Sequence, residues 1–336
     1  MGMEILRRLG ITPRRVFSGR GVKPHLSLFF NDVDGIERIF GIDTTPFSKK
    51  MVEPDSYLIT HAHSDHYGKY AMSSKLSVAS EETAIALDLL HGREFKGATF
   101  RVGESFLIGE TEISTFHTGH TIGSSAYLWE TECGVRILVT GDVKEYRVLP
   151  SCDLLVTEAN YGDPSDSTCY FEENSKDFLE IAGGGEVVFG AYAFGKAQRA
   201  VKMLRNSGFE DPIGMSQKSL NLTRSLLKES GNLVGLSDDA DVWIVPPHEL
   251  SGIERSNRFV LTCRSDYHYY PAIHLSDHMD VRGLVAMVKH CQPEVTLLYH
   301  PRGDRPKKLA DHLLSEELCA AAIAAEEIPP TTLSKK

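Results

Sequence analysis

The sequence predicts a mixed α/β protein in which a smaller α/β unit is inserted into a larger one. Two observations support this prediction. Short apolar and β-branched runs dominate residues 26–158, whereas strand and helix patterns alternate from about residue 164 onward. The 336 residues are 41% hydrophobic and 24% charged, a composition typical of a globular protein with a large core.

The first region is predicted to form a series of strands separated by turns. We expect strands at LSLFF, ERIFGID, SYLITH, LSVAS, SSAYLWE, VRILVT and DLLVTEA. The segment ETECG lies between two of these runs and predicts a hairpin. The run EETAIALDLLHG, which starts at Glu81, has the apolar spacing of a helix.

The pattern changes after about Pro164. The runs EVVFGAY, PIGMS and DVWIVPP predict strands, and FGKAQRAVKMLRNSG and QKSLNLTRSLLKESG predict the helices between them. This alternation is typical of a small parallel sheet with crossover helices. We therefore predict a first domain made of residues 1–164 and 269–336, with an inserted domain at residues 165–268.

Composition and charge indicate where the protein works. No apolar run approaches the roughly 18 residues that a membrane span needs, and no long apolar stretch follows the basic pairs near the N-terminus. We expect a cytoplasmic protein without membrane association. The sequence does not indicate the oligomeric state.

The net charge of −10 argues against a generally basic surface for nucleic acid. Bound divalent cations would nevertheless supply positive charge where a phosphate binds.

The segment ITHAHSDHYG, at the end of a predicted strand, carries the strongest chemical signal. It brings His61, His63, Asp65 and His66 within six positions. Imidazole nitrogens and carboxylate oxygens are the ligands that zinc prefers. In an extended segment His61 and His63 point to the same side, so both can meet one ion, while Asp65 and His66 in the turn can face a second.

Two later segments offer further ligands. HTGHTIGS places His120 in a glycine-rich loop, and LVTGDVK places Asp142 at the end of a strand, where a carboxylate could bridge two ions. Either residue alone would be interpreted as an ordinary loop or turn residue. Their order after the HxHxDH pattern favours a metal site instead.

In this combination of motifs, from Asp43 in FGIDTTPF to His300 in LLYHPRGD, the sequence resembles the metallo-β-lactamase superfamily. The resemblance implies an αββα sandwich that binds two zinc ions, with manganese as an alternative. It implies that one ion is held by His61, His63 and His120, and the other by Asp65, His66 and His300. Asp142 would bridge the ions, and Asp43 would orient a ligand without binding metal.

Three further segments resemble the β-CASP nuclease branch of that superfamily. TEANYGDP carries Glu158, HLSDHMD carries His278, and LLYHP carries His300, while AYAFGKAQRA resembles the start of the inserted β-CASP domain. The whole chain is similar to ligase-associated DNA exonucleases and to archaeal 3′-end processing factors. Three positions depart from the common pattern, with Asn160 in place of serine or threonine, Met279 in place of alanine and Pro301 in place of glycine.

The resemblance implies a zinc-dependent nuclease of the 3′-end processing or exonuclease type. Two ions roughly 3.5–4 Å apart can hold one hydroxide that attacks a phosphodiester. His278 would protonate the departing oxygen, Glu158 would orient His278, and Asp65 is assigned to both the catalytic and the metal-binding set. Lys196, at the start of a predicted helix, and Ser276, beside His278, are predicted to contact the substrate.

Two alternatives remain open at this point. A metallo-hydrolase of a small ester, thioester or lactam would use the same ions but would give Glu158 and His278 no role. A non-catalytic scaffold would be expected to have lost ligands, and none of the seven is missing. A histidine at position 300 is compatible with both RNA and single-stranded DNA as the substrate.

Overall fold

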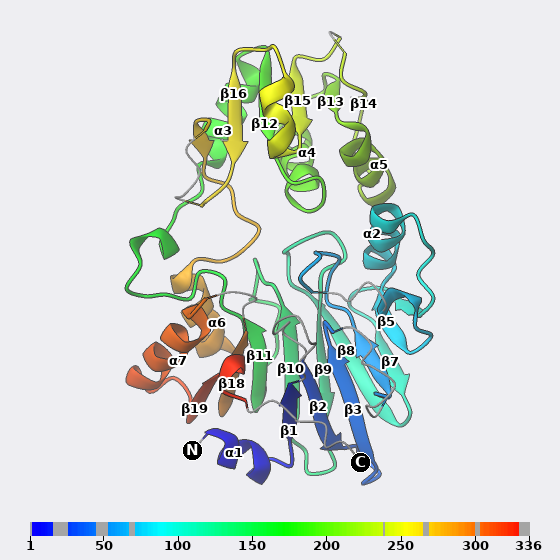
Figure 1. Ribbon diagram of the computed structural model, residues 1–336, viewed down its shortest axis with the longest axis vertical. Coiled ribbons are helices and arrows are strands. Elements are labelled where there is room, and N and C mark those ends of the chain that lie inside the picture. The colour runs from blue at the N-terminus through cyan, green and yellow to red at the C-terminus, as the bar shows by residue number, and fades with distance from the viewer. Residues whose placement is uncertain are drawn as a thin grey trace, which may run out of the picture. The chain divides into compact units, whose positions relative to one another are not determined.

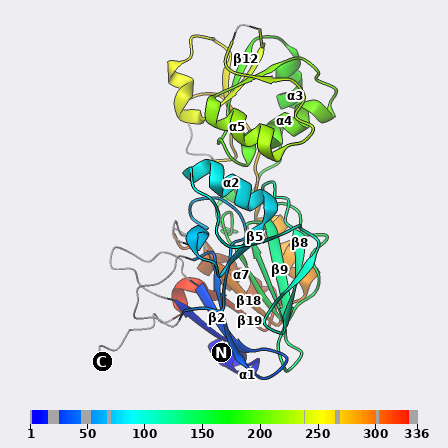
Figure 2. The same cartoon turned by 90° about the vertical axis from the view of Figure 1, so that its right-hand side faces the viewer.

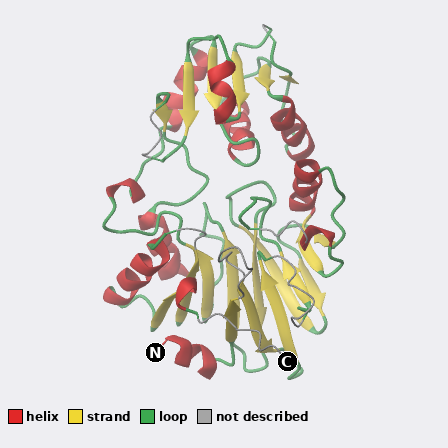
Figure 3. Cartoon of the chain, viewed as in Figure 1, coloured by secondary structure: helices red, strands yellow, loops and turns green. Residues whose placement is uncertain are grey.

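The computed structural model describes residues 2–15, 26–44, 53–66, 71–237, 239–264, 269–299 and 303–328. The chain divides into two compact units, one formed by Met1–Cys169 with His278–Lys336 and the other by Tyr170–Asp277. Each unit combines strands and helices, so the predicted mixed α/β class is confirmed (Figures 1 and 3). The sequence predicts an insertion at residues 165–268, and both observed junctions lie further along the chain.

The first unit contains two sheets. The described strands of one sheet follow chain order: β1 (Thr12–Arg15), β2 (Leu26–Asn31), β3 (Glu37–Ile42), β4 (Ser56–Leu58), β5 (Ser77–Ser80) and β6 (Ala98–Phe100). The strands β1, β2 and β3 are antiparallel, whereas β3 to β6 run parallel.

The other sheet has the order β19-β18-β11-β10-β9-β8-β7. Its described strands are β7 (Ser105–Ile108), β8 (Thr111–His117), β9 (Ser125–Glu130), β10 (Arg136–Gly141), β11 (Leu154–Glu158), β18 (Val295–Tyr299) and β19 (Ala321–Ala324). The strands β7 to β10 form an antiparallel meander, and β10, β11, β18 and β19 are parallel.

Alternating side chains pack the two sheets of this unit against each other. Phe30 and Phe40 of the first sheet contact Trp129 of the second, with ring centroids 5.6 and 5.2 Å apart. Along β10, Ile137 and Val139 enter this shared core, whereas Leu138 faces the opposite side. This period of two is what a strand buried on both faces requires.

Helices cover the outer face of the second sheet. Leu138 and its neighbours pack there against α6 (Val281–Cys291) and α7 (Arg305–Ser315). Figure 2 shows α7 beside β18 and β19. The remaining helices of this unit are α1 (Gly2–Arg8), which contacts β18 and β19, and α2 (Glu81–His91), which contacts β5 and β6. Within the described ranges, no helix is long and apolar enough to cross a membrane.

The second unit is built around a parallel sheet with the order β14-β13-β15-β12-β16-β17. Its described strands are β12 (Val187–Gly190), β13 (Ile213–Met215), β14 (Leu233–Val234), β15 (Val242–Val245), β16 (Arg258–Leu261) and β17 (Ala272–Ile273). Its helices are α3 (Ser175–Gly183), α4 (Lys196–Asn206) and α5 (Gln217–Leu226). The crossover helices match the alternating pattern expected from the sequence.

The carboxyl ends of several parallel strands carry the polar residues of the first unit. Asp43 follows β3, His61 follows β4, Asp142 follows β10, and Glu158 ends β11. Gly141 allows the two sheets to approach here, because a Cβ at this position would lie 2.3 Å from the Thr60 hydroxyl oxygen. Its φ of 62° also belongs to the left-handed region that glycine adopts without strain.

Candidate metal centre and its polar surroundings

Asp43 organises the backbone that precedes the histidine motif. Its carboxylate accepts hydrogen bonds from the Thr60 backbone N–H at 2.8 Å and from the Thr60 hydroxyl at 2.7 Å. The Oδ2 atom of Asp43 also lies 3.1 Å from Nδ1 of His66. Asp43 has a φ of 44°, a left-handed conformation that aspartate tolerates better than most residues. Its contact with Nδ1 leaves Nε2 of His66 as the nitrogen available to a ligand.

Hydrogen bonds also tie the loops of His120 and Asp142 together. The backbone N–H groups of Lys144 and Glu145 both donate to the Thr118 carbonyl at 2.8 Å. On the other side of His120, the Gly123 carbonyl accepts from the Ser80 hydroxyl at 2.7 Å. Ser80 is also the N-cap of α2. The loop of His120 is therefore held on both sides by residues that belong to other elements.

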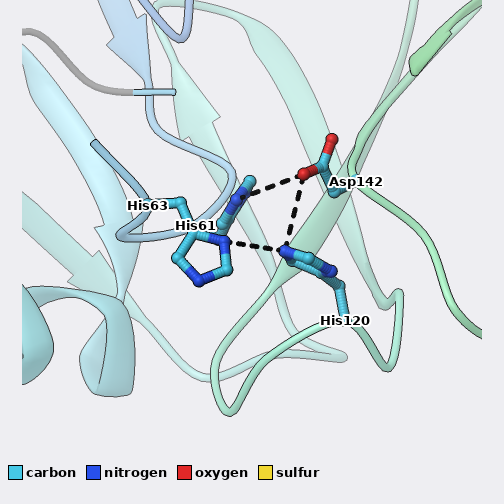
Figure 4. Close-up of side chains that lie close together, drawn as sticks. All are labelled: His61, His63, His120 and Asp142. Atoms are coloured by element: carbon cyan, nitrogen blue, oxygen red, sulfur yellow. Dashed lines mark hydrogen bonds and ion pairs between the residues drawn. The ribbon is translucent and has the colours of Figure 1, made fainter. Parts of the chain in front are cut away.

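The structure brings four of the predicted ligands into one cluster. One ligand atom each of His61, His63, His120 and Asp142 lies within 4.8 Å of the others (Figure 4). Nε2 of His120 lies 2.9 Å from Nδ1 of His63. Each of the three rings is thus oriented with a nitrogen toward a shared space, as ligands of one ion would be.

The two oxygens of Asp142 face different histidines. Its Oδ2 atom lies 3.7 Å from Nε2 of His61 and 3.5 Å from Nε2 of His120. Its Oδ1 atom lies 3.2 Å from Nε2 of His66. A carboxylate in this position can offer one oxygen to each of two ions, which is the geometry expected of a bridging ligand.

Burial and charge decide the ionisation of these groups. Burial disfavours a charged Asp142, but the nearby His66, His278 and His120 outweigh this effect and hold the pKa of the carboxyl well below its ordinary value. Burial would lower the pKa of His66, yet Asp142 and Asp43 raise it well above the ordinary value. Burial lowers the pKa of His61 well below its ordinary value, and His66 and His120 act in the same direction.

A cation fits the donor set of the histidine cluster. Nε2 of His61 is buried and has no hydrogen-bond partner among the described residues. Its Nδ1 atom instead contacts the Thr60 hydroxyl oxygen at 3.0 Å. A neutral imidazole with a buried nitrogen facing a carboxylate and other imidazoles has the chemistry of a ligand for a divalent transition metal.

Glu158 and His278 form a second group around Asp142. Nδ1 of His278 lies 3.2 and 3.1 Å from the two carboxylate oxygens of Glu158. Asp142, Glu158 and His278 also have ligand atoms close enough to hold an ion. However, the Asn160 amide nitrogen lies 3.2 Å from Oδ1 of Asp142, 2.7 Å from Oε2 of Glu158 and 3.2 Å from Nδ1 of His278. The Asn160 amide N–H groups already serve the carboxylates of Asp142 and Glu158, so the histidine cluster is the better cation site.

Asn160 is the one residue of this arrangement to which the sequence interpretation gave no role. The available signal was its position two residues after Glu158, where it departs from the common serine or threonine. Its side-chain amide connects Asp142 with Glu158, and its backbone carbonyl accepts a hydrogen bond from Arg305. Asn160 therefore links the metal cluster to the Glu158–His278 pair.

The other predicted site residues have different placements. Asp65 is exposed and lines a cavity together with Asp43 and Tyr299, outside the two clusters formed by the described residues. Lys196, the first residue of α4, and Ser276 are both buried and belong to the second unit. His300 lies outside the described residues.

The chain is similar in sequence to two proteins. An RNase J-like protein of Methanocaldococcus jannaschii is 24% identical over 184 residues, which cover 45% of this chain and 44% of that protein. A ribonuclease of Thermus thermophilus is 26% identical over 208 residues, which cover 50% of this chain and 46% of that protein. The aligned segments thus span less than half of each relative. No protein-family model matches the chain.

The chain resembles ribonucleases of the β-CASP metallo-β-lactamase family. This finding confirms the resemblance that the sequence motifs indicate. A solved structure of a protein of unknown function from Enterococcus faecalis shares the fold, with a TM-score of 0.61 and 12% identity over 86% of this chain and 93% of that one.

The cluster of three histidines and Asp142 predicts that a substitution of Asp142 lowers the amount of bound metal. Asp142→Asn removes the negative charge that faces three histidines, so we expect the variant to retain less than about half of the bound metal. Elemental analysis by mass spectrometry after removal of free metal measures this. Asp163→Asn is the matched control, because Asp163 is a buried carboxylate of the same unit that pairs with Lys308 and not with the cluster. Equal metal content in wild type and Asp142→Asn would contradict the assignment.

Proposed function

We propose that this chain is a metal-dependent nuclease that hydrolyses phosphodiester bonds of single-stranded nucleic acid. The observation that carries the proposal is the position of Asp142, which faces a histidine cluster with one oxygen and His66 with the other, beside the Glu158–His278 pair. Hydrolysis of a natural phosphodiester gains from both parts, because one activates water and the other delivers a proton to the poor leaving group.

We propose further that the first unit is an αββα metallo-β-lactamase sandwich and that the second is its β-CASP-like insertion. Two packed sheets with α6 and α7 on an outer face support the first assignment. A separate parallel α/β unit between residues 169 and 278 supports the second. The similarity to two ribonucleases is consistent with both assignments.

In the proposed centre, His61, His63 and His120 would hold one zinc ion, Asp65, His66 and His300 would hold the other, and Asp142 would serve as a ligand of both. Asp43 positions His66 through the contact with Nδ1. When bound, two zinc or manganese ions would activate a water molecule and neutralise charge on the phosphate. The pKa shifts of Asp142 and His61 favour this use, because an ionised carboxylate and a neutral imidazole are the forms that bind metal.

His278 is proposed to donate the proton that the departing sugar oxygen needs. Its Nδ1 atom contacts both oxygens of Glu158, an arrangement that directs the Nδ1–H toward the carboxylate and leaves Nε2 to face the substrate. The backbone N–H of Val143 donates to Oε1 of Glu158 at 2.7 Å, and the Asn160 amide donates to Oε2. Glu158 is therefore fixed before the substrate arrives, which limits the motion of His278.

The proposed main substrate is RNA, by analogy with the two ribonucleases, and the alternative substrate is single-stranded DNA. Lys196 and Ser276 are proposed to contact the substrate, Lys196 at a phosphate. The mode of action would be of the 3′-end processing or exonuclease type. A small-molecule hydrolase is the weaker alternative, because it leaves the hydrogen-bonded Glu158–His278–Asn160 group without a chemical purpose.

Labelled single-stranded RNA should be cleaved by the purified protein loaded with zinc or manganese. Chelation should abolish cleavage, and added metal should restore it, since the ions activate the water and neutralise the phosphate. Gel analysis of 5′- and 3′-labelled strands, with DNA of the same sequence in parallel, measures activity and polarity. Hydrolysis of a lactam or thioester without cleavage of either nucleic acid would instead support the small-molecule alternative.

His278→Ala should keep the bound metal and lose RNA cleavage by about 10²–10⁴-fold, the usual contribution of a positioned general acid. The loss should be much smaller for a nitrophenyl phosphodiester, whose leaving group needs no proton. Glu158→Gln should show the same selectivity more weakly, because it acts through His278. The measurements are steady-state rates on both substrates and metal content by elemental analysis.

Two results would count against this role of His278. If His278→Ala loses an ion, His278 is a metal ligand and the cluster of Asp142, Glu158 and His278 becomes the relevant cation site. If both substrates slow equally, His278 does not protonate the leaving oxygen.

A further inference from the structure

Two carboxylates and an imidazole of the first unit lie close enough together to hold an additional cation. One ligand atom each of Asp142, Glu158 and His278 lies within 4.8 Å of the other two. Both carboxylate side chains are almost fully buried, so water screens their mutual repulsion poorly. Such a group needs either a positive charge or a set of hydrogen-bond donors to compensate it.

The side-chain amide of Asn160 supplies the donors. Its nitrogen lies 3.2 Å from Oδ1 of Asp142, 2.7 Å from Oε2 of Glu158 and 3.2 Å from Nδ1 of His278. The amide nitrogen therefore lies among the same three side chains that a cation would need as ligands. A zinc ion bound there would need its ligand atoms at roughly 2.0–2.2 Å, so the ion and the amide nitrogen exclude each other.

The number of amide hydrogens indicates the direction of each hydrogen bond. A primary amide has two N–H donors, and the oxygens of Asp142 and Glu158 are acceptors for both. Nδ1 of His278 must then carry a hydrogen of its own and donate it to Glu158, whose oxygens lie 3.2 and 3.1 Å away. Serine or threonine, common at position 160 in the branch that the sequence resembles, has a single hydroxyl hydrogen and could serve only one carboxylate.

The first turn of α7 holds the loop that carries Asn160. The Arg305 guanidinium donates to the Asn160 backbone carbonyl, and its central carbon lies 5.7 Å from the centroid of the Tyr161 ring. The Lys308 ammonium donates to Oδ2 of Asp163 at 2.6 Å, further along the same loop. These contacts belong to the first unit alone, and they keep the Asn160 amide in its place beside the carboxylates.

We propose that Asn160 excludes a cation from the group formed by Asp142, Glu158 and His278, and so reserves His278 for proton transfer. The amide compensates both carboxylates without a formal charge. A cation in its place would take Nδ1 of His278 as a ligand and break the hydrogen bond to Glu158. The inference rests on the proposed function for its use of His278, but the metal binding that it predicts can be measured without any nuclease activity.

Asn160→Asp tests the proposal, because it keeps the shape of the side chain and replaces the N–H donors by a third carboxylate. We expect the variant to bind about one zinc ion per chain more than the wild type, since three carboxylates and an imidazole form a full ligand set. Equilibrium dialysis against zinc, followed by elemental analysis, measures this. Asn31→Asp is the matched control and should leave the zinc content unchanged, because the exposed Asn31 amide also donates to a carboxylate of the first unit, that of Glu132 at 3.0 Å.

Adding His278→Ala shows where the additional ion binds. In the wild-type background His278→Ala should leave the zinc content unchanged, whereas in the Asn160→Asp background it should remove about one ion per chain. A zinc content of Asn160→Asp equal to that of the wild type would overturn the inference. An additional ion that stays bound after His278→Ala would also overturn it, because that ion would lie elsewhere.

The zinc counts separate this inference from the proposed function. A wild-type protein that cleaves no nucleic acid would overturn the proposed function and leave the zinc counts as the test of cation exclusion. Thermal unfolding followed by circular dichroism identifies a variant that fails to fold. If Asn160→Asp fails to fold, Asn160→Ala carries the test, because it removes the amide and should admit the same ion with lower affinity. A zinc titration of Asn160→Ala identical to that of the wild type would then contradict the proposal.

Discussion

The carboxylate of Asp142 imposes the main physical constraint on the first unit. It is almost fully buried, and an isolated charge in such a place would be strongly disfavoured. Nitrogens of three histidines from two separate segments approach it, and the Asn160 amide donates to one of its oxygens. These contacts with the Asp142 carboxylate require that β4, β10 and β11 end at the same edge of the unit. Glycine at position 141 allows this, because a Cβ there would clash with the Thr60 side chain.

The residues around Asp142 divide into two groups with different chemistry. On one side the histidines offer nitrogens, including Nε2 of His61, which has no hydrogen-bond partner in the part of the chain that the structure describes, and this suits a cation. On the other side Glu158, Asn160 and His278 satisfy one another by hydrogen bonds, which suits the storage and delivery of a proton. Asp142 contacts both groups, so changes in its charge state would be felt by the metal centre and by the proton donor together.

Much of this arrangement is local in sequence and could be predicted. The HxHxDH segment, the strand ends at Asp142 and Glu158, and the alternating elements of the second unit each follow from periodicity and spacing. The helix α1 and the strands β1, β6 and β7 do not follow from the sequence pattern, because they are short or weakly patterned and depend on tertiary pairing. The alternating pattern predicts an insertion at residues 165–268, and composition alone does not fix the junctions of such an insertion to the residue.

Contacts between distant residues could not be predicted from the sequence. The amide of Asn160 reaches His278 across 118 positions, and Arg199 reaches Ser276 across 77. No local pattern indicates such partners, since an asparagine after a strand or an arginine on a helix is usually solvated. The structure is needed to see that the Asn160 amide contacts His278 and that Arg199 binds the Ser276 backbone.

Anomalous X-ray scattering at the zinc absorption edge, from crystals of the zinc-loaded protein, tests the central claim about Asp142 most directly. We predict two peaks, one beside each carboxylate oxygen, with His61, His63 and His120 around the first and His66 beside the second. A single peak enclosed by Asp142, Glu158 and His278 would contradict it, because His278 would then be a ligand and not a proton donor.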